Sequence, residues 1–375
     1  MKVLHLINTS GYYGAEAMII ELAAEQVIMG CKTLICCIVD SDTELPELYV
    51  KAKDKGLDAD LLVLTGTVFE QGAMLLAYAN KNAVNVVHSH GYRPGILLSL
   101  QKKDSSLLYV RTLHGWTYTS YLSKMFIYTV LDVISLWRQD VCVAVSDKLR
   151  SLQIMKFAPG KRIQQIDNGI SGFGSKSIER EELEDIQWRT LCNTTFVMGN
   201  IGRLSKEKDQ GKLIQALSLM RSKGYSVSLV ILGEGEERNM LTQLAKELKV
   251  DDYVHMPGYC ENASRYMKCM DVLCLSSTTE GLPITILEAM REGLPVLSTD
   301  VGDISKLLDD GRGLLLDGDD VSEIQEKLCW LYDNRSDSMA MIKLAKQYFY
   351  INHTSKIMAS RYISVYERYS SVPYE

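Results

Sequence analysis

Several features are missing from this sequence, and each absence narrows the class of protein it encodes. No uninterrupted apolar run approaches the roughly 20 residues that cross a bilayer. The N-terminus enters a strand-like pattern directly, without the segments of a signal peptide. The nine cysteines are scattered and form no C-x-x-C motif, which argues against a disulfide framework or a cysteine zinc site. We therefore expect a cytoplasmic protein with free thiols.

An overall excess of positive charge is also missing, although the near-neutral first half leaves room for a local basic face. Residues 1–170 carry a net charge of +1, and residues 171–375 carry a net charge of −7. A nucleic-acid partner needs concentrated Lys and Arg, so we expect none. The chain also has no G-x-G-x-x-G motif, which argues against an ordinary NAD-linked dinucleotide enzyme.

Apolar runs rich in Val, Ile and Leu alternate with longer helix-like segments along the 375 residues, a length that suits two domains. Continuous apolar strands separated by helices predict parallel sheets covered on both faces. The pattern restarts after about residue 190, which predicts an α/β protein of two doubly wound, Rossmann-like domains. The expected segments are an N-terminal domain (1–170), a linker (171–190), a C-terminal domain (191–353) and a last helical segment (354–375) crossing back to the N-terminal domain.

The expected elements follow from these runs. Strands are predicted near residues 3–7, 33–39, 61–64, 84–88, 107–111, 141–145 and 163–166, and then near 196–201, 227–232, 253–256, 272–276, 295–298 and 313–315. Helices are predicted near 15–29, 121–136, 208–222, 236–248, 284–291, 321–332 and 354–369. Open α/β sheets bind ligands beyond the carboxyl ends of their strands, so the loops after the strands are the candidate sites.

The loop after the first expected strand places Gly14 at the start of a helix. Glycine there lets backbone N–H groups approach an anion at the positive end of the helix dipole. The same residue also fits a turn that needs positive φ. Contact with a diphosphate and a plain turn are both open interpretations.

Two cations follow the first strand of the second half, in the run from Gly202 and Arg203 to Lys208. A planar guanidinium and an ammonium together suit a diphosphate, although Lys and Arg are most often solvated surface residues. Two later loops contain Gly233 and Tyr259. Gly233 could line a nucleotide pocket and Tyr259 could flank a base, but plain turns explain both loops as well.

The most informative segment runs from Glu280 through Gly281 and Leu282 to Glu288. Glu280 follows a buried strand, and Glu288 lies eight residues later inside the next helix. The residues between them are almost wholly apolar, which makes a solvated surface role for Glu288 less attractive. A carboxylate accepts hydrogen bonds from two hydroxyls at once, which suits sugar and ribose diols.

These features together resemble the GT-B glycosyltransferases of family 4. The resemblance covers nearly the whole chain, and its sharpest signature is the E-x7-E arrangement from Glu280 to Glu288. It is supported by the runs Gly202-Arg203-Leu204…Lys208, Gly233-Glu234-Gly235, Asn168-Gly169-Ile170 and Gly293-Leu294-Pro295-Val296. The resemblance implies two Rossmann-like domains that face a central cleft, and transfer with retention of anomeric configuration.

The resemblance also implies roles for single residues. Arg203 and Lys208 would neutralise the diphosphate, Glu280 would hold hydroxyls of the donor sugar, and His114 would lie near that sugar. The other expected donor contacts are Gly14, Gly202, Gly233, Tyr259, Gly281, Leu282 and Glu288. Tyr13, which stands where many relatives carry glycine, and His90 are assigned to the acceptor side.

The function implied is the transfer of a hexose or N-acetylhexosamine from a nucleotide diphosphate sugar to a hydroxyl acceptor. A UDP-sugar is favoured as donor over a GDP-sugar, and the acceptor is a sugar or a lipid-linked sugar in polysaccharide, lipopolysaccharide or glycolipid synthesis. Two alternatives remain: a nucleotide-sugar 2-epimerase of the same fold, against which the E-x7-E loop argues, and a non-catalytic sugar-nucleotide-binding protein.

We expect no cofactor and no metal. Asp-x-Asp pairs, which bind metal in other transferases, occur at Asp40/Asp42, Asp58/Asp60 and Asp317/Asp319. Chance explains such pairs in a chain this rich in acids, and Arg203 and Lys208 already supply the positive charge that a metal would provide.

Membrane contact is a separate hypothesis. Residues 121–137 form an unusually apolar helical stretch, broken by Lys124 and Asp132. The nearby cations are Arg138, Lys148, Arg150, Lys156, Lys161 and Arg162. Weak, reversible binding of the first domain to the anionic inner face of a membrane is one interpretation. Packing of this helix on the first domain's own sheet is the other, and it is slightly favoured.

Overall fold

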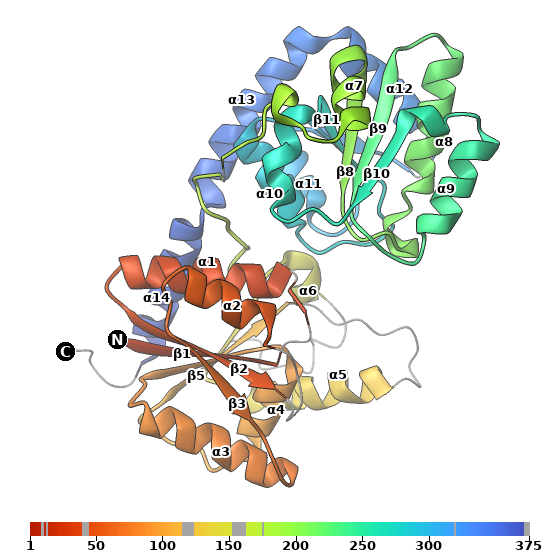
Figure 1. Cartoon of the computed structure of the whole chain (residues 1–375). Coiled ribbons are helices and arrows are strands. Elements are labelled where there is room, and N and C mark those ends of the chain that lie inside the picture. Colours follow the sequence, from red (N-terminus) through yellow and green to blue (C-terminus); the bar gives the residue numbers. More distant parts are fainter. Residues whose placement is uncertain are drawn as a thin grey trace. The chain divides into compact units, whose positions relative to one another are not determined.

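The computed structural model describes residues 1–8, 11–12, 14–39, 45–114, 124–151, 163–174, 176–318 and 320–370. The chain divides into two compact units (Figure 1). The first consists of Met1–Ser171 together with Thr354–Glu375, and the second of Gly172–His353.

The first unit is built on a seven-stranded parallel sheet in the order β3-β2-β1-β4-β5-β6-β7. Its strands are β1 (Lys2–Asn8), β2 (Lys32–Val39), β3 (Ala59–Val63), β4 (Val86–His90), β5 (Leu108–Leu113), β6 (Val141–Ala144) and β7 (Ile163–Gln165). Its helices are α1 (Gly14–Ile28), α2 (Glu47–Asp54), α3 (Val68–Lys81), α4 (Tyr92–Ser99), α5 (Lys124–Ser135), α6 (Asp147–Ser151) and α14 (Ser355–Tyr369). A short 3-10 helix, η1 (Leu136–Arg138), follows α5.

Successive side chains of β1 alternate between the two faces of the sheet and pack in two different hydrophobic cores. Val3 and Ile7 pack with residues of α1, α2 and α14 on one face of the sheet. Leu4 and Leu6 pack with residues of α3 and α4 on the other face. Successive side chains of a strand point to opposite faces, so a run that is apolar on both faces predicts a strand covered by helices on both sides.

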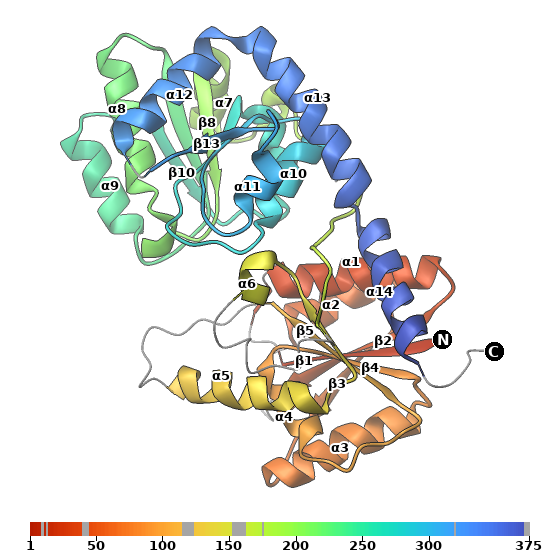
Figure 2. The same ribbon diagram turned by 180° about the vertical axis from the view of Figure 1, so that it is seen from behind.

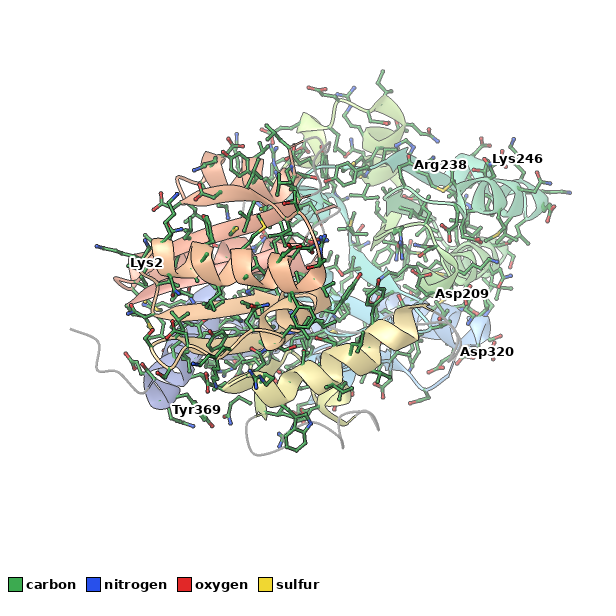
Figure 3. All side chains as sticks on the ribbon, turned by 90° about the horizontal axis from the view of Figure 1, so that it is seen from below. Lys2, Asp209, Arg238, Lys246, Asp320 and Tyr369 are labelled. Atoms are coloured by element: carbon green, nitrogen blue, oxygen red, sulfur yellow. The ribbon has the colours of Figure 1, made fainter. Side chains whose placement is uncertain are left out.

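The final helix belongs to the first unit. Met358, Tyr362 and Tyr366 of α14 are buried in the same core as α1, and Figure 2 shows α14 beside α1. Lys2 at the start of β1 and Tyr369 at the end of α14 are both labelled in Figure 3. The Thr354 side chain accepts a hydrogen bond from the Ile357 N–H and so caps the helix.

The second unit contains a six-stranded parallel sheet in the order β10-β9-β8-β11-β12-β13. Its strands are β8 (Phe196–Ile201), β9 (Val227–Leu232), β10 (Val254–Gly258), β11 (Val272–Leu275), β12 (Val296–Thr299) and β13 (Leu314–Leu316). Its helices are α7 (Ile186–Thr194), α8 (Gly211–Ser222), α9 (Arg238–Glu247), α10 (Ile284–Glu292), α11 (Ile304–Leu308), α12 (Val321–Asp333) and α13 (Arg335–Asn352). The 3-10 helices are η4 (Arg180–Glu182), η5 (Lys206–Lys208), η6 (Asp251–Tyr253) and η7 (Ala263–Cys269).

Two parallel, doubly wound sheets confirm the predicted α/β class, and each expected strand overlaps an observed one. The expected linker at 171–190 differs from the structure. The Asp185 carboxylate caps α7 by accepting a hydrogen bond from the Trp188 N–H, and Trp188 is only 2% exposed. The segment therefore packs as part of the second unit, and its polar composition reflects an exposed surface.

The apolar stretch expected at 121–137 begins outside the described residues and continues as α5 and η1. Part of it contributes to a core, since Val133 and Leu136 are buried. Its exposed apolar residues are Tyr128, Val130, Leu131, Ile134 and Trp137. Lys156, Lys161 and Arg162 lie outside the described residues. Within the described part of the chain, no helix has the length and apolar character that a membrane span requires.

Candidate functional site

The candidate site in the second unit lies in loops at the carboxyl ends of its central strands. Strands β8 and β11 are neighbours in the sheet and run parallel, so the loops that follow them leave the same edge. Most of the predicted donor residues come from these two loops. The sheet order, rather than closeness in sequence, brings them together.

The loop after β8 presents both predicted cations. The Arg203 guanidinium is 62% exposed and forms an ion pair with Glu207, with 2.6 Å between Nη2 and Oε1. The chain then turns through η5 and through Asp209, whose φ of 46° is left-handed. This turn ends at the start of α8 and leaves Lys208 at the sheet edge.

A short ion pair joins the two loops. The Lys208 Nζ lies 2.6 Å from Glu280 Oε1, with side-chain exposures of 27% and 10%. The Ser277 hydroxyl donates to the same carboxylate oxygen at 2.7 Å. The Ser276 hydroxyl donates to the backbone carbonyls of Lys208 and Asp209. An ammonium and a carboxylate are therefore held side by side by residues of both loops.

Gly233 allows the loops after β8 and β9 to approach each other closely. Its φ is 154°, and a Cβ atom there would lie 2.0 Å from the Gly202 carbonyl oxygen. The Gly202 N–H donates to Leu232 O, and the Gly233 N–H donates to Gly258 O. Close backbone packing therefore accounts for Gly233, which agrees with the turn interpretation.

The loop that carries Glu280 is supported by the chain after β12. Gly302 has a φ of 68°, and a Cβ atom there would lie 2.4 Å from the Glu280 carbonyl oxygen. The Asp303 N–H donates to Gly281 O at 3.1 Å. Gly281 itself is exposed, whereas Leu282 is buried. Helix α10 starts directly afterwards, and its N-cap residue Pro283 provides no side-chain cap.

Glu288 lies in α10, and its protonation is shifted by its surroundings. Burial raises the pKa of its carboxyl group from 4.5 to about 7. The neighbouring charge of Arg291 and a hydrogen bond with Ser264 oppose this shift, whereas the carboxylate of Glu292 adds to it. A carboxyl group that titrates near neutral pH beside a strand-end loop is typical of functional sites.

Tyr259 follows β10 and is 68% exposed. Gly258 before it has a φ of 102°, and a Cβ atom there would lie 2.8 Å from Glu234 Oε1. Glu234 in turn pairs with Arg238, the first residue of α9 (labelled in Figure 3), at 2.6 Å. The backbone of this loop is held in place, and the side chain of Tyr259 is largely exposed to solvent.

Among the described residues, the predicted Gly14, His90 and His114 of the first unit lie at the carboxyl edge of its sheet. Gly14 is exposed at the start of α1, and Tyr13 lies outside the described residues. His114 directly follows β5, and burial lowers its pKa to about 3. Its Nε2 lies 3.1 Å from His90 Nδ1.

The predicted acceptor contact of His90 disagrees with the structure. His90 ends β4 with no exposed surface, and both of its ring nitrogens face other histidines. His5 and His88, which are not among the predicted site residues, lie in the same buried group. In the sequence, such residues can be recognised as polar residues inside a strand that is otherwise apolar.

Two family models match the chain, one to each unit. The model named Glycosyltransferase Family 4 matches residues 12–171, and the model named Glycosyl transferases group 1 matches residues 184–348. Together the two models account for most of the chain.

Individual proteins are also similar. An uncharacterized glycosyltransferase of Methanocaldococcus jannaschii is 32% identical over 180 residues, which are 48% of this chain and 42% of that protein. The capsular polysaccharide biosynthesis glycosyltransferase CapM of Staphylococcus aureus is 25% identical over 223 residues, 57% of each chain. The chain thus matches less than two thirds of the length of either relative.

The crystal structure of Anabaena HepE in complex with UDP has a TM-score of 0.83 to this chain at 16% identity. The likeness covers 98% of this chain and 100% of that chain, and at this identity it shows the fold alone. The two family models and the shared fold lead to one conclusion: the chain belongs to glycosyltransferase family 4 and has the GT-B fold.

Proposed function

We propose that this protein transfers a hexose or an N-acetylhexosamine from a nucleotide diphosphate sugar to a hydroxyl acceptor, with retention of configuration. The donor is a UDP-sugar, with a GDP-sugar as the second choice. The UDP bound to HepE and the capsule role of CapM support a UDP-sugar and an acceptor in polysaccharide, lipopolysaccharide or glycolipid synthesis. The protein acts in the cytoplasm, with reversible contact to the inner face of the membrane.

The observation that carries this proposal is the Lys208–Glu280 pair at the edge of β8 and β11. Leaving-group departure builds negative charge on the diphosphate and positive charge on the anomeric carbon. Preorganised cations aimed at the diphosphate lower that barrier. In the proposed arrangement Lys208 and Arg203 stabilise the diphosphate, and Glu280 holds hydroxyls of the donor sugar.

The neighbouring groups complete the proposed donor site. Backbone N–H groups at Gly281 and Leu282 lie just before α10, where the positive end of the helix dipole favours negative charge. Once it has lost its proton, the Glu288 carboxylate accepts hydrogen bonds from the two ribose hydroxyls with its two oxygens. The proton of the acceptor hydroxyl passes to a phosphate oxygen, so the reaction needs no strong protein base.

No metal is needed in this proposal, because Arg203 and Lys208 supply the positive charge. Of the residues in the three Asp-x-Asp pairs, only Asp58, Asp60 and Asp317 lie in the described part of the chain. Asp60 in β3 accepts a hydrogen bond from the hydroxyl of Tyr78 in α3, and the Asp317 side chain is 97% exposed. Asp40, Asp42 and Asp319 lie outside the described residues.

Titration calorimetry with nucleotide diphosphates tests the two carboxylates separately. Glu288→Ala should weaken binding of free UDP, because it removes the ribose contact. Glu280→Ala should leave UDP affinity close to that of the wild type and weaken the extra binding that a UDP-sugar gains over UDP. Equal losses of UDP affinity in the two variants would contradict the assignment.

Incubation with donor alone separates transfer from the epimerase alternative. A transferase leaves the sugar of the nucleotide unchanged without an acceptor, apart from slow hydrolysis. Release of the C2 epimer from the donor alone would overturn the proposed function. Binding of donor without turnover on any hydroxyl acceptor would favour the non-catalytic alternative.

A further inference from the structure

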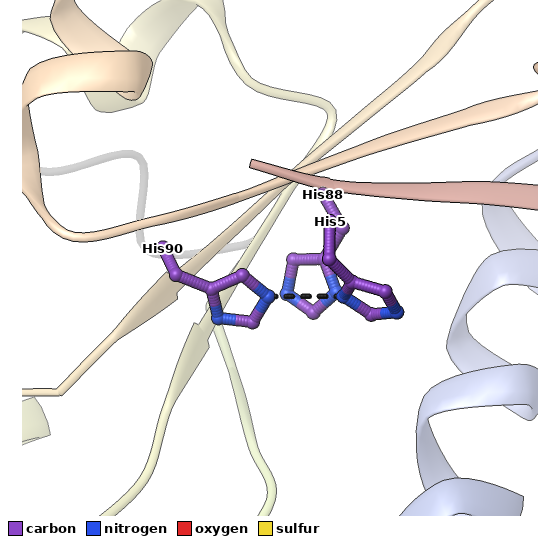
Figure 4. A group of neighbouring side chains, drawn as sticks. All are labelled: His5, His88 and His90. Carbon is purple, nitrogen blue, oxygen red and sulfur yellow. Dashed lines mark hydrogen bonds between the residues drawn. The ribbon is translucent and has the colours of Figure 1, made fainter. Parts of the chain in front are cut away.

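A continuous run of buried polar side chains crosses the core of the first unit. His114 Nε2 faces His90 Nδ1 at 3.1 Å, and His90 Nε2 faces His5 Nδ1 at 3.1 Å. His5 Nε2 faces Gln26 Oε1 at 2.8 Å. His5, His90 and Gln26 have no exposed surface. Figure 4 shows the contact between His5 and His90, with His88 beside them.

The run continues beyond Gln26 to the final helix. The Gln26 Nε2 donates to the Tyr366 hydroxyl at 3.3 Å, and this hydroxyl lies 2.7 Å from His88 Nδ1. His88 Nε2 lies 2.7 Å from the Thr112 hydroxyl, which lies 3.0 Å from the Tyr362 hydroxyl. Helix α14 therefore supplies two hydroxyl groups to a network that begins at the sheet edge.

A metal site is the first alternative for this cluster. His5, His88 and His90 each offer a nitrogen within 4.8 Å of the others. However, all six of their ring nitrogens already face a hydrogen-bonding partner within 3.1 Å. This group of described residues contains no carboxylate to balance a buried cation. Hydrogen bonding therefore accounts for the cluster better than metal binding does.

The four imidazoles are neutral at physiological pH. Burial lowers the pKa of His5 to about 4 and that of His114 to about 3, and it holds the pKa of His88 and of His90 well below the ordinary value. A neutral imidazole carries one N–H donor and one acceptor nitrogen. The position of one hydrogen therefore fixes the position of the next along the run.

The amide of Gln26 sets the direction. Its Oε1 accepts only, so the hydrogen of His5 lies on Nε2 and His5 Nδ1 accepts. His90 must then donate from Nε2 and accept at Nδ1. His114 must in turn donate from Nε2, which leaves its Nδ1 as a lone-pair acceptor. The Nε2 of the same amide donates to the Tyr366 hydroxyl.

We propose that Gln26, His5 and His90 are positioning residues that hold His114 in its Nε2–H tautomer, so that His114 Nδ1 accepts a hydrogen bond from a sugar hydroxyl. This inference rests on the proposed function and on the family resemblance, which implies that His114 lies near the donor sugar. The buried residues do not touch the substrate. They determine which ring nitrogen of His114 carries the hydrogen. Because Nδ1 is then an acceptor, a sugar group that donates a hydrogen bond is favoured there over a group that only accepts.

The tautomer is measured directly by nuclear magnetic resonance of the full chain labelled with ¹⁵N-histidine. The sequence contains only six histidines, and substitution of single histidines assigns the signals. His114 is expected as the Nε2–H tautomer alone. A wild-type protein in which His114 carries its hydrogen on Nδ1 overturns the proposal, and this measurement needs no variant.

Two variants of similar burial test the cause. Gln26→Met removes the amide that sets the direction, and His114 should change from one tautomer to a mixture of both. Tyr362→Phe removes a hydroxyl at the far end, beyond His88 and off the path from Gln26 to His114, and should leave the tautomer unchanged. The proposal that Gln26 sets the tautomer of His114 is contradicted by either of two results. One is a single Nε2–H tautomer of His114 in folded Gln26→Met, and the other is a mixture of tautomers in Tyr362→Phe.

The same spectra connect the tautomer to the sugar. Addition of a UDP-sugar that binds by calorimetry should shift the His114 Nδ1 signal, whereas UDP should shift it little. An unchanged Nδ1 signal at saturating UDP-sugar overturns the proposed sugar contact. A failure of the proposed function is distinguishable, because it appears as the absence of binding to UDP and to UDP-sugars, while the tautomer of the free protein is measured independently.

Discussion

The raised pKa of Glu288 predicts that the protein loses stability as the pH rises through neutrality. The folded protein binds the Glu288 proton more tightly than the unfolded chain does, since burial raises the pKa from 4.5 to about 7. The stabilisation from this proton is fully present below pH 4.5 and is lost as the pH rises through 7. Glu288→Gln keeps the shape of the side chain and removes the titration.

The size of the effect follows from the shift. A change from 4.5 to about 7 corresponds to at most about 3.5 kcal/mol between the two limits, because one pKa unit is about 1.4 kcal/mol. Between pH 5 and pH 8.5 the wild type should therefore lose roughly 2.5 kcal/mol relative to Glu288→Gln. For a unit of this size, the difference corresponds to a shift of about 5–10 °C in the melting temperature.

Differential scanning calorimetry is the suitable assay, because two units can melt in separate transitions. The transition of the second unit should fall between pH 5 and pH 8.5 by more in the wild type than in Glu288→Gln. Glu236→Gln is the matched control, since Glu236 is an exposed residue of the same unit, and it should follow the wild type. Identical pH dependence in the wild type and Glu288→Gln would refute the argument that burial raises the pKa of this carboxyl group.

Four further outcomes are expected. Lys208→Ala should lower turnover roughly a hundredfold. Lys206 is an exposed lysine of the same 3-10 helix, and Lys206→Ala should keep the wild-type turnover. Equal turnover in the two variants would show that Lys208 is not part of the site. Activity should survive excess EDTA, and a loss that magnesium or manganese restores would contradict the metal-free proposal. Asp132→Ala should lower the unfolding free energy measured in urea by about 3–5 kcal/mol, because it leaves buried Arg111 without the carboxylate that lies 2.9 Å from its Nη2. The protein should float with anionic vesicles at low salt and less so at high salt, and Ile134→Asp on the exposed face of α5 should weaken this binding; indifference to anionic vesicles would remove the membrane hypothesis.

The sequence alone is sufficient to locate the strands, because a strand buried on both faces appears as a continuous apolar run. It also points to Lys208 and Glu280, since each lies in a loop after such a run. Their 2.6 Å contact depends on the adjacency of β8 and β11, which no local pattern reveals. The roles given to both residues rest on their side-chain chemistry and on the family resemblance, and they stay predictions.

Local composition is a poor guide to burial where tertiary packing decides the outcome. The expected linker is polar over much of its length, yet Trp188 is buried and its ring stacks on Tyr266. His90 follows a strand in the manner of a ligand-binding residue, yet it has no exposed surface. A strand end therefore predicts where the backbone emerges, and it does not decide whether the last side chain faces solvent or the core.

The buried histidines can be recognised in the sequence as polar residues within apolar strands. In a strand whose neighbours are apolar on both faces, a polar side chain is buried and must find a hydrogen-bonding partner. His5 lies between Leu4 and Leu6, and His88 and His90 are two residues apart on β4. The register then places His5 opposite His88, so three polar residues on one face of two central strands predict a buried polar network. The partners were beyond prediction, because Tyr366 is 340 residues from Gln26 and reaches it only through the packing of the final helix.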